Sequence, residues 1–136
     1  MTLLKTIEII NDVAMAHPLV NSFNEGNIYD INSNTNNIYP SIILSQAPHN
    51  LGTNTNQFNF NIFYCDRLTE NRDNRLLIQS NAIIVLTELI NRLREIFLNI
   101  NANTITTFHD RFSDELAGAY STINIEVPNI GECFYD

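Results

Sequence analysis

The chain has 136 residues, the length of one domain, and 44% of them are hydrophobic, which suits a single buried core but not two. Only seven Lys and Arg oppose 15 Asp and Glu, and the net charge of −8 argues against binding to nucleic acid or an anionic membrane, because phosphate binding depends on Lys and Arg. Cys65 and Cys133 lack a CxxC spacing, which argues against a disulfide framework or zinc site and favours synthesis in a reducing cytosol.

The first predicted element is a helix from Leu3 to about Ala16, which Thr2 caps and Pro18 ends. Its apolar residues recur at helical spacing: Leu3, Ile7, Ile10 and Ala14. This start lacks the pattern of a secretory signal, and we find no run of about 20 apolar residues that predicts a membrane span. Residues 18–37 contain the run NSNTNN and no sustained period, so they are predicted to form a long Asn-rich loop.

A first strand pair is predicted at residues 38–46 and 57–66, joined by the polar connector APHNLGTNTN at residues 47–56. The second strand alternates cleanly, and its core face carries Phe58, Phe60, Ile62 and Tyr64. Phe63 and Cys65 interrupt its polar face, which indicates that the back of the sheet is partly covered there. The connector is longer than a tight hairpin needs, so we expect it to protrude.

Residues 71–98 are predicted to form one long helix of about 40 Å, at about 1.5 Å per residue. It carries two apolar stripes, one with Leu76, Ile83, Leu86, Ile90, Leu93 and Phe97, and the other with Ile78, Ala82, Val85, Leu89 and Ile96. Together the stripes form an arc that is wider than one sheet face requires. We therefore expect the sheet, the first helix and a neighbouring subunit to share in covering it.

A second strand pair is predicted at residues 103–110 and 119–127, with the polar turn FSDELAG at 112–118 between them. Gly118 is a natural place for a positive φ in this turn. Pro128 stops the pairing, and the apolar tail at 128–136 is expected to dock. The order helix, strand, strand, helix, strand, strand describes a single α+β domain over residues 1–136, with a mostly antiparallel sheet and its helices packed on one face.

The residues that carry chemistry are few and scattered. His109, Asp110 and Arg111 are adjacent, but neighbouring strand residues point to opposite faces of a sheet and do not grip one substrate atom together. Cys65 is a candidate thiolate if a histidine lies near it in space, yet its aromatic strand favours a buried thiol. The three histidines have no metal-binding spacing. The sequence therefore predicts no catalytic residue, no metal site and no cofactor.

Charge is unevenly distributed along the chain. Five of the seven cations fall between residues 67 and 94: Arg67, Arg72, Arg75, Arg92 and Arg94. Residues 110–136 hold six acids against Arg111 alone. One side of the molecule is therefore a candidate to complement another side of a second copy, although a solvated mixed surface explains the pattern equally well.

Three segments carry a resemblance: YPSIILSQAPHN, FNFNIFYCDRLTENRDNRLLIQSNAIIVLTELINRL and FHDRFSDELAGAYSTINIEVP. In their order and in short stretches of sequence they resemble the small neck and tail-connector proteins of crAss-like bacteriophages, which are similar in turn to the tail-terminator class. The resemblance covers residues 38–128 and implies a tail-terminator-like α+β fold that assembles into rings between portal and tail. It carries no catalytic residue, and the 18–37 loop and the 128–136 tail lie outside it.

The resemblance implies a virion structural protein, a homo-oligomeric ring in the neck or tail that surrounds the DNA channel and is made in the host bacterial cytoplasm. Its expected partners are copies of itself, neighbouring portal, connector or tail proteins, and passing genomic DNA that an acidic ring does not bind. The candidate interface residues lie on the connector, the sheet, the long helix and the turn: His49, Asn54, Phe63, Ile78, Val85, Leu89, Phe112, Asp114 and Glu115.

Two functions of other classes stay open. A soluble phage-encoded binding module would engage a host or virion protein through the Phe-rich sheet, and it predicts a monomer with an exposed apolar patch. A small hydrolase built on Cys65 or His109 predicts that alanine at either position abolishes an activity while the fold stays intact.

Overall fold

The computed structural model describes residues 1–27, 38–111 and 115–128, and its first element is helix α1 at Leu3–Met15. Thr2 caps this helix as predicted, because its side-chain oxygen accepts a hydrogen bond from the backbone N–H of Lys5 at 3.1 Å. The buried face of α1 carries Thr6, Ile10 and Ala14. The Thr6 hydroxyl donates to the carbonyl of Thr2 at 2.9 Å, so its polar group is satisfied where the helix is buried.

Seven strands of the described residues form one sheet: β1 (Ser22–Glu25), β2 (Ser41–Gln46), β3 (Asn50–Leu51), β4 (Thr55–Arg67), β5 (Asn99–Asn101), β6 (Thr106–Arg111) and β7 (Leu116–Pro128). Their spatial order is β1-β2-β4-β7-β5, with β3 beside β4 and β6 beside β7. The pair β1 and β2 is parallel, whereas the other described pairs are antiparallel. The sheet is mostly antiparallel, as predicted.

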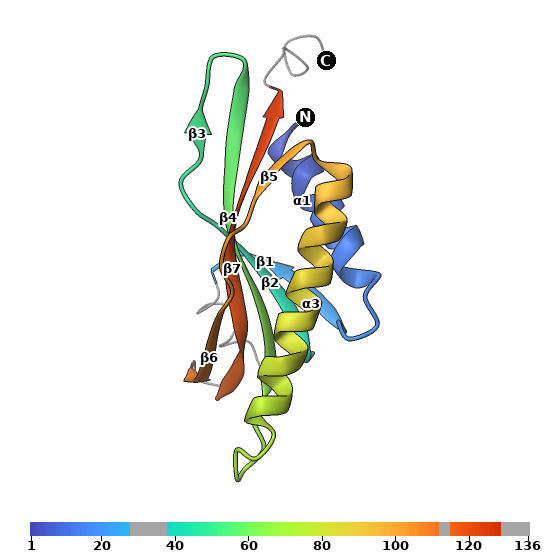
Figure 1. Cartoon of the computed structure of the whole chain (residues 1–136), viewed down its shortest axis with the longest axis vertical. Coiled ribbons are helices and arrows are strands. Elements are labelled where there is room, and N and C mark those ends of the chain that lie inside the picture. Colours follow the sequence, from blue (N-terminus) through green and yellow to red (C-terminus); the bar gives the residue numbers. More distant parts are fainter. Residues whose placement is uncertain (28–37, 112–114, 129–136) are drawn as a thin grey trace.

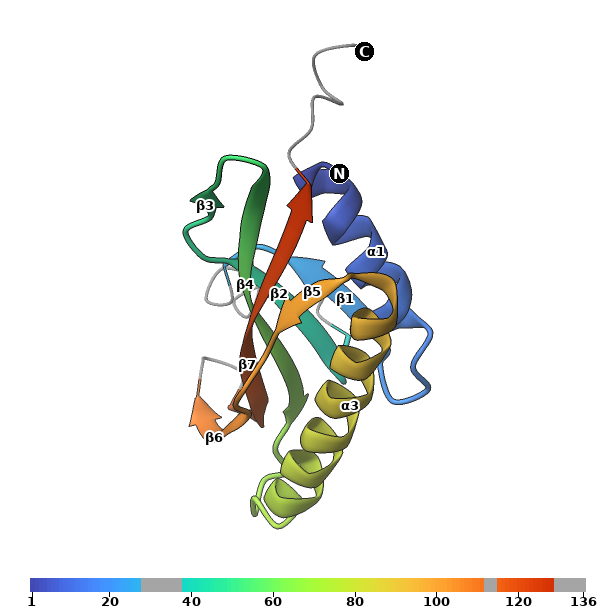
Figure 2. The ribbon, with the colours of Figure 1, turned by 45° about the horizontal axis from the view of Figure 1, so that its top comes forward.

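The long strands β4 and β7 form the spine of the sheet (Figure 1). They pair over their whole lengths, from Thr55 opposite Pro128 to Arg67 opposite Leu116. On the side of β7 that faces away from β4, β5 and β6 lie beside opposite ends of β7 and form one edge of the sheet (Figure 2). Side chains alternate between the two faces of β4, and those of its predicted core face point inward. Four of them are buried: Phe58, Phe60, Ile62 and Tyr64.

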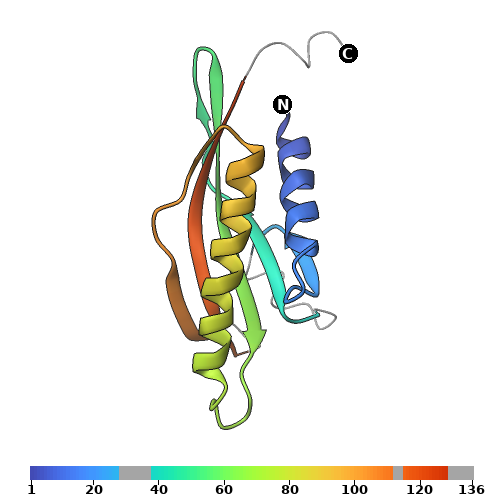
Figure 3. The same ribbon diagram turned by 45° about the vertical axis from the view of Figure 1, so that its right-hand side comes forward.

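Helix α3 (Arg75–Ile96) lies along this spine and faces the main core. Its buried residues follow one stripe: Ile78, Gln79, Ala82, Val85, Leu86, Leu89, Ile90 and Leu93. Both helices cover the same face of the sheet, as predicted, and α1 lies beside the C-terminal half of α3 (Figure 3). The N-terminal half of α3 extends beyond α1, toward the end of the molecule where β4 stops and β7 starts (Figure 1).

The helix begins later than the predicted residue 71 because the residues before Arg75 form a hydrogen-bonded loop. The side-chain oxygen of Asn74 accepts a hydrogen bond from the backbone N–H of Thr69 at 2.9 Å, and its amide nitrogen donates to the carbonyl of Arg67 at 3.1 Å. Asn74 thereby ties the end of β4 to the start of α3.

A smaller apolar cluster, the back cluster, lies on the opposite face of the sheet: Ile43, Cys65, Phe108 and Leu116, flanked by Tyr39, Phe63 and Tyr120. The rings of Phe63 and Tyr120 lie 5.3 Å apart, and the Arg67 guanidinium lies 5.0 Å from the centre of the Tyr39 ring. The cover that Phe63 and Cys65 predict for this part of the back face is therefore confirmed.

The sequence patterns miss three strands. β1 lies inside the predicted 18–37 loop, β3 lies inside the 47–56 connector, and β5 precedes the predicted second strand pair. These strands have four, two and three residues, which is too short for a period of their own, and each is defined by its pairing with another strand. The predicted order of two helices and four strands is therefore incomplete, while the α+β class is confirmed.

Candidate functional site

The N-terminal half of α3 exposes large apolar side chains on the side that points away from the sheet. Four of them are prominent: Leu76 (68% exposed), Leu77 (63%), Ile83 (43%) and Ile84 (46%). Ser80 and Thr87 are also exposed and lie among them at helical spacing. We name these six residues the α3 outer face. No charged residue occurs anywhere from 76 to 87.

This half of the helix is apolar around most of its circumference. Its buried stripe already meets the sheet, so the outer apolar side chains are not needed to fill the core. A helix that is hydrophobic all round is normally covered on every side. Exposed apolar patches rimmed by polar residues mark interaction sites in soluble proteins. The α3 outer face is therefore the candidate functional site.

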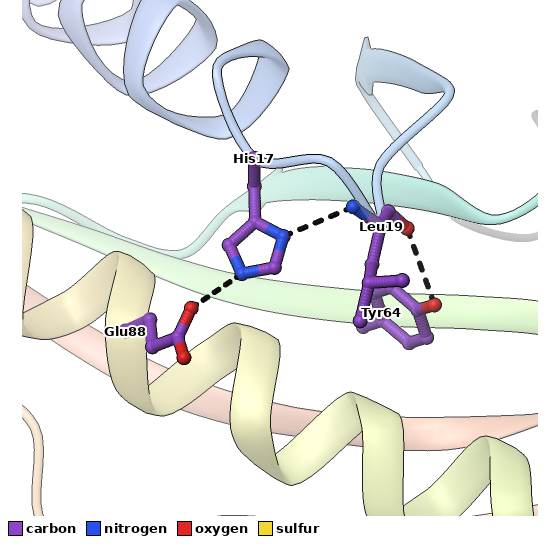
Figure 4. A network of polar contacts seen from close by, with 4 residues as sticks. All are labelled: His17, Leu19, Tyr64 and Glu88. Carbon is purple, nitrogen blue, oxygen red and sulfur yellow. Dashed lines mark hydrogen bonds and ion pairs between the residues drawn. The ribbon is translucent and has the colours of Figure 1, made fainter.

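The C-terminal half of α3 is covered by the end of α1 and the loop that follows it. His17 Nδ1 accepts the backbone N–H of Leu19 at 3.1 Å, so the ring proton lies on Nε2 and is donated to Glu88 Oε2 at 2.6 Å (Figure 4). The Tyr64 hydroxyl donates to the Leu19 carbonyl at 3.3 Å. Burial raises the pKa of Tyr64 to about 12, which keeps this donor protonated. The loop thus links α1 to both α3 and β4.

The N-terminal half of α3 is anchored by polar contacts on its inner side. Gln79 Nε2 donates to the backbone carbonyl of Phe108 on β6 at 3.1 Å, and Gln79 Oε1 accepts from Arg75 at 3.3 Å. In the loop before the helix, Arg72 forms an ion pair with Glu115 at 3.0 Å. The outer face is therefore presented by a helix that is fixed to the sheet.

Three predicted interface residues lie on the wrong side of α3. Ile78, Val85 and Leu89 are each at most 4% exposed within one copy, so the interface role predicted for them is wrong. The sequence period predicts a wide apolar arc but not which edge of that arc meets the sheet. Leu77 and Ile84, which belong to neither of the two predicted stripes, are exposed instead. The signal for them is the runs of adjacent apolar residues at 76–78 and 82–86, which spread apolar side chains over more of the helix circumference than a buried stripe occupies.

On the connector, His49 and Asn54 are both exposed, but His49 is bonded to its own copy. His49 Nδ1 accepts the backbone N–H of Asn59 at 3.0 Å, and its Nε2 lies 3.0 Å from Gln46 Oε1. Asn54 lies in the tip of the hairpin between β3 and β4, which protrudes at one end of the molecule (Figure 1). His49 thus holds the connector against β4, whereas Asn54 stays an interface prediction.

The other predicted interface residues differ in their settings. Phe63 is half-buried beside the back cluster. Glu115 is exposed, has a φ of 53° and pairs with Arg72 of the same copy. Phe112 and Asp114 lie outside the described residues. These four positions stay predictions.

Gly118 has the predicted positive φ, at 158°, but it lies inside β7 opposite Cys65 and not in a turn. A Cβ at this position would lie 1.8 Å from the backbone oxygen of Tyr64. The close approach of β4 therefore requires glycine here. The structural role of Gly118 is retained, and its assignment to the turn is wrong.

The hydrolase hypothesis places a thiolate at Cys65, and the structure contradicts that role. Cys65 is fully buried, and burial raises the pKa of its thiol, which holds the sulfur in the protonated, unreactive form. His109 is exposed on β6, where the strand register shifts between Phe108 and Arg111. Within the described part of the chain, no group of three His, Cys, Asp or Glu residues is placed to hold a metal.

Two hollows beside α3 are small. One of about 120 Å³ contains Arg94 and the buried Ser121, whose hydroxyl has no hydrogen-bond partner among the described residues. The other, of about 230 Å³, lies where α3 and β7 end, and its lining includes Met1, Ile96, Leu98, Val127 and Pro128. Both are smaller than the roughly 300–1,000 Å³ of typical small-molecule sites.

By length and composition alone, α3 is also long and apolar enough to cross a membrane, contrary to the expectation from the sequence. Its 22 residues span about 33 Å. In this structure its buried stripe packs on the sheet, as the stripe of a core helix does. The same composition leaves the α3 outer face apolar.

A comparison with models of known protein families finds no match for this chain. A comparison with curated protein sequences finds no match either. The function of this chain is therefore inferred from the geometry of the α3 outer face.

Proposed function

We propose that this chain is a virion structural protein, one subunit of a tail-terminator-like, homo-oligomeric ring in the phage head-to-tail connector. The observation that carries the proposal is the α3 outer face, an exposed apolar surface on a chain whose main core is already filled. Such a surface favours a protein partner. A ring subunit needs two unlike patches that bind each other in neighbouring copies, and the outer face supplies one of them.

The net charge of −8 supports a position around a DNA channel. An acidic wall repels phosphates, and at moderate salt the repulsion extends about 10 Å, so passing DNA is not held. The partners are then other copies of the chain together with neighbouring portal, connector or tail proteins. The chain is made in the host bacterial cytoplasm and ends in the neck or tail of the virion.

A soluble binding module that uses its Phe-rich sheet is the alternative function, and it receives less support. Phe58 and Phe60 point into the main core, and Phe63 is half-buried. Within the described residues, the exposed apolar patch that this alternative requires lies on α3, whereas the sheet exposes one large apolar side chain, Leu51.

Native mass spectrometry and negative-stain microscopy of the purified full chain test the ring. We expect closed particles of one copy number. Leu77→Asp combined with Ile84→Asp should abolish them, because two carboxylates would have to be buried at the contact. The matched control is Leu4→Asp combined with Met15→Asp on α1, whose side chains are similarly exposed at 67% and 45%. A monomer under virion-like conditions that does not assemble on portal or tail proteins would contradict the proposal.

A further inference from the structure

The chain contains a short apolar segment that suits the α3 outer face. Residues 129–136 read NIGECFYD and include Ile130, Phe134 and Tyr135. The four exposed apolar side chains of the outer face present on the order of a few hundred Å², the size of a functional patch on a single subunit. A stable flat interface buries about 800 Å² per partner, so the outer face suits a short segment better than a second flat surface.

The segment begins at the far end of the molecule from the outer face. Pro128 ends β7 and lines the same hollow as Ile96 at the C-terminal end of α3, whereas the N-terminal end of α3 lies at the opposite end of the molecule (Figure 1). Leu77 lies about 28 Å from Ile96 along the helix. Phe134 lies at most about 22 Å from Pro128 even in a fully extended chain. Phe134 therefore reaches at most the near part of the outer face of its own copy, where Ile83 and Ile84 lie about 18–20 Å from Ile96, and it stays short of Leu77. The part of the face around Leu76 and Leu77 is left to a segment from another copy.

We propose that Phe134 and Tyr135 of one copy bind the α3 outer face of the next copy. This inference rests on the proposed ring, for which it names a contact between subunits. The contact joins unlike surfaces at opposite ends of the molecule, so it is heterologous and can close into a ring. Neither the outer face nor residues 133–135 contains a charged residue, so no charge is taken out of water when they meet.

A peptide measures the binding of the segment apart from ring formation. A fluorescein-labelled peptide of residues 127–136, with Cys133→Ser, is titrated into the full chain that carries Phe134→Ser and Tyr135→Ser. We expect a saturable rise in anisotropy, an affinity weakened by about tenfold or more when the chain also carries Leu77→Asp and Ile84→Asp, and no change with Leu4→Asp and Met15→Asp. No saturable binding, or binding that the outer-face substitutions leave unchanged, would overturn the proposal.

A cross-link decides whether the segment reaches its own copy or the next. Ser80→Cys places a thiol in the middle of the outer face, and a short bismaleimide joins it to the native Cys133, while the buried Cys65 reacts slowly. In a mixture of tagged and untagged chains, we expect links between copies, which Cys133→Ser removes. Links formed only within one copy, or no link to Cys133, would overturn the proposal.

Different results would contradict the ring and the contact of Phe134 and Tyr135 with the outer face. If the full chain forms rings that persist with Phe134→Ser and Tyr135→Ser, the contact of Phe134 and Tyr135 with the outer face is wrong and the ring stands. If the peptide binds the outer face while the full chain assembles neither alone nor on its partners, the ring is wrong and the contact stands.

Discussion

The two halves of helix α3 share one buried stripe but differ on the side that points outward. In the C-terminal half the outward residues include Glu88, Arg92 and Glu95, all exposed, and the end of α1 lies beside Glu88 and Arg92. In the N-terminal half the outward side is uncharged, and Leu76 and Leu77 are its most exposed large apolar residues. Both halves meet the sheet in the same way, so the difference lies in the surface that another molecule would contact and not in the fold.

The sheet beneath the two halves differs as well. Near the start of α3 the back cluster gives the sheet a second apolar layer, and Gln79 of α3 bonds to Phe108 within it. Toward the end of α3 the back face carries polar residues such as Asn124 and Glu126 on β7. The end of the molecule that contains the outer face is thus apolar in three layers: the back cluster, the core and the outer face itself.

The largest effect is expected where the strands of that apolar end approach most closely. Gly118→Val should prevent folding, with a loss of unfolding free energy above about 4 kcal/mol, because a Cβ there meets the Tyr64 oxygen at 1.8 Å. Circular dichroism and the yield of soluble protein measure this loss. Thr122→Val, at an exposed position of the same strand, is the control and should fold. If the Gly118 variant were as stable as the natural chain, β4 and β7 would have to be farther apart at this position than the structure places them.

Local patterns along the sequence correctly predict the features that depend only on residues near one another in the chain. The alternation in β4 and the Thr2 cap are both confirmed. By contrast, β1 has four residues and exists because Ser22 to Glu25 pair with Ser41 to Leu44, which no local pattern reveals. Tertiary pairing, not propensity, defines such short strands.

The candidate site is predictable only in part, for a related physical reason. The surplus of apolar residues on α3 is visible in the sequence, because the arc is wider than a sheet can cover. Which residues of that arc stay outside depends on the rotation of the helix about its axis, and packing against the sheet determines this rotation. The predicted Ile78 and Val85 are therefore buried, while their neighbours Leu77 and Ile84 are exposed.

A matched pair of leucines separates the inner stripe of α3 from its outer face. Leu86→Ala should lower the free energy of unfolding by about 2–5 kcal/mol, because it opens a cavity at a fully buried position. Leu77→Ala, at an exposed position of the same helix, should change it by no more than about 0.5 kcal/mol. Urea denaturation of both variants at low protein concentration measures the difference. Equal losses would mean that the outer face is part of the core.

A smaller effect is expected at the contact between α1 and the C-terminal half of α3. Glu88→Ala removes the acceptor of the His17 Nε2 proton and should cost at most about 1 kcal/mol, because the Glu88 side chain is 59% exposed. Glu95→Ala, which breaks the exposed pair with Arg92, is the control and should cost less. A large loss in Glu88→Ala would show that α1 depends on this bond for its position, and proteolysis of α1 would then report its release.

The smallest effect tests a partly buried charge at the apolar end. Asp66 lies opposite Ala117 near the end of β4, and burial raises the pKa of its carboxyl although the Arg67 backbone N–H and guanidinium partly offset the rise. Below the unfolded pKa of about 3.9 the carboxyl is protonated in both states, and as pH rises through the folded pKa the folded state loses stability because it must carry a partly buried charge. Asp66→Asn should therefore unfold at a slightly higher urea concentration than the natural chain at pH 7 and at the same concentration near pH 3, whereas Asp12→Asn controls for the loss of one exposed charge. A variant that is less stable at pH 7 would mean that the Asp66 charge is favourable, and the apolar end would then include a charged group that the fold uses.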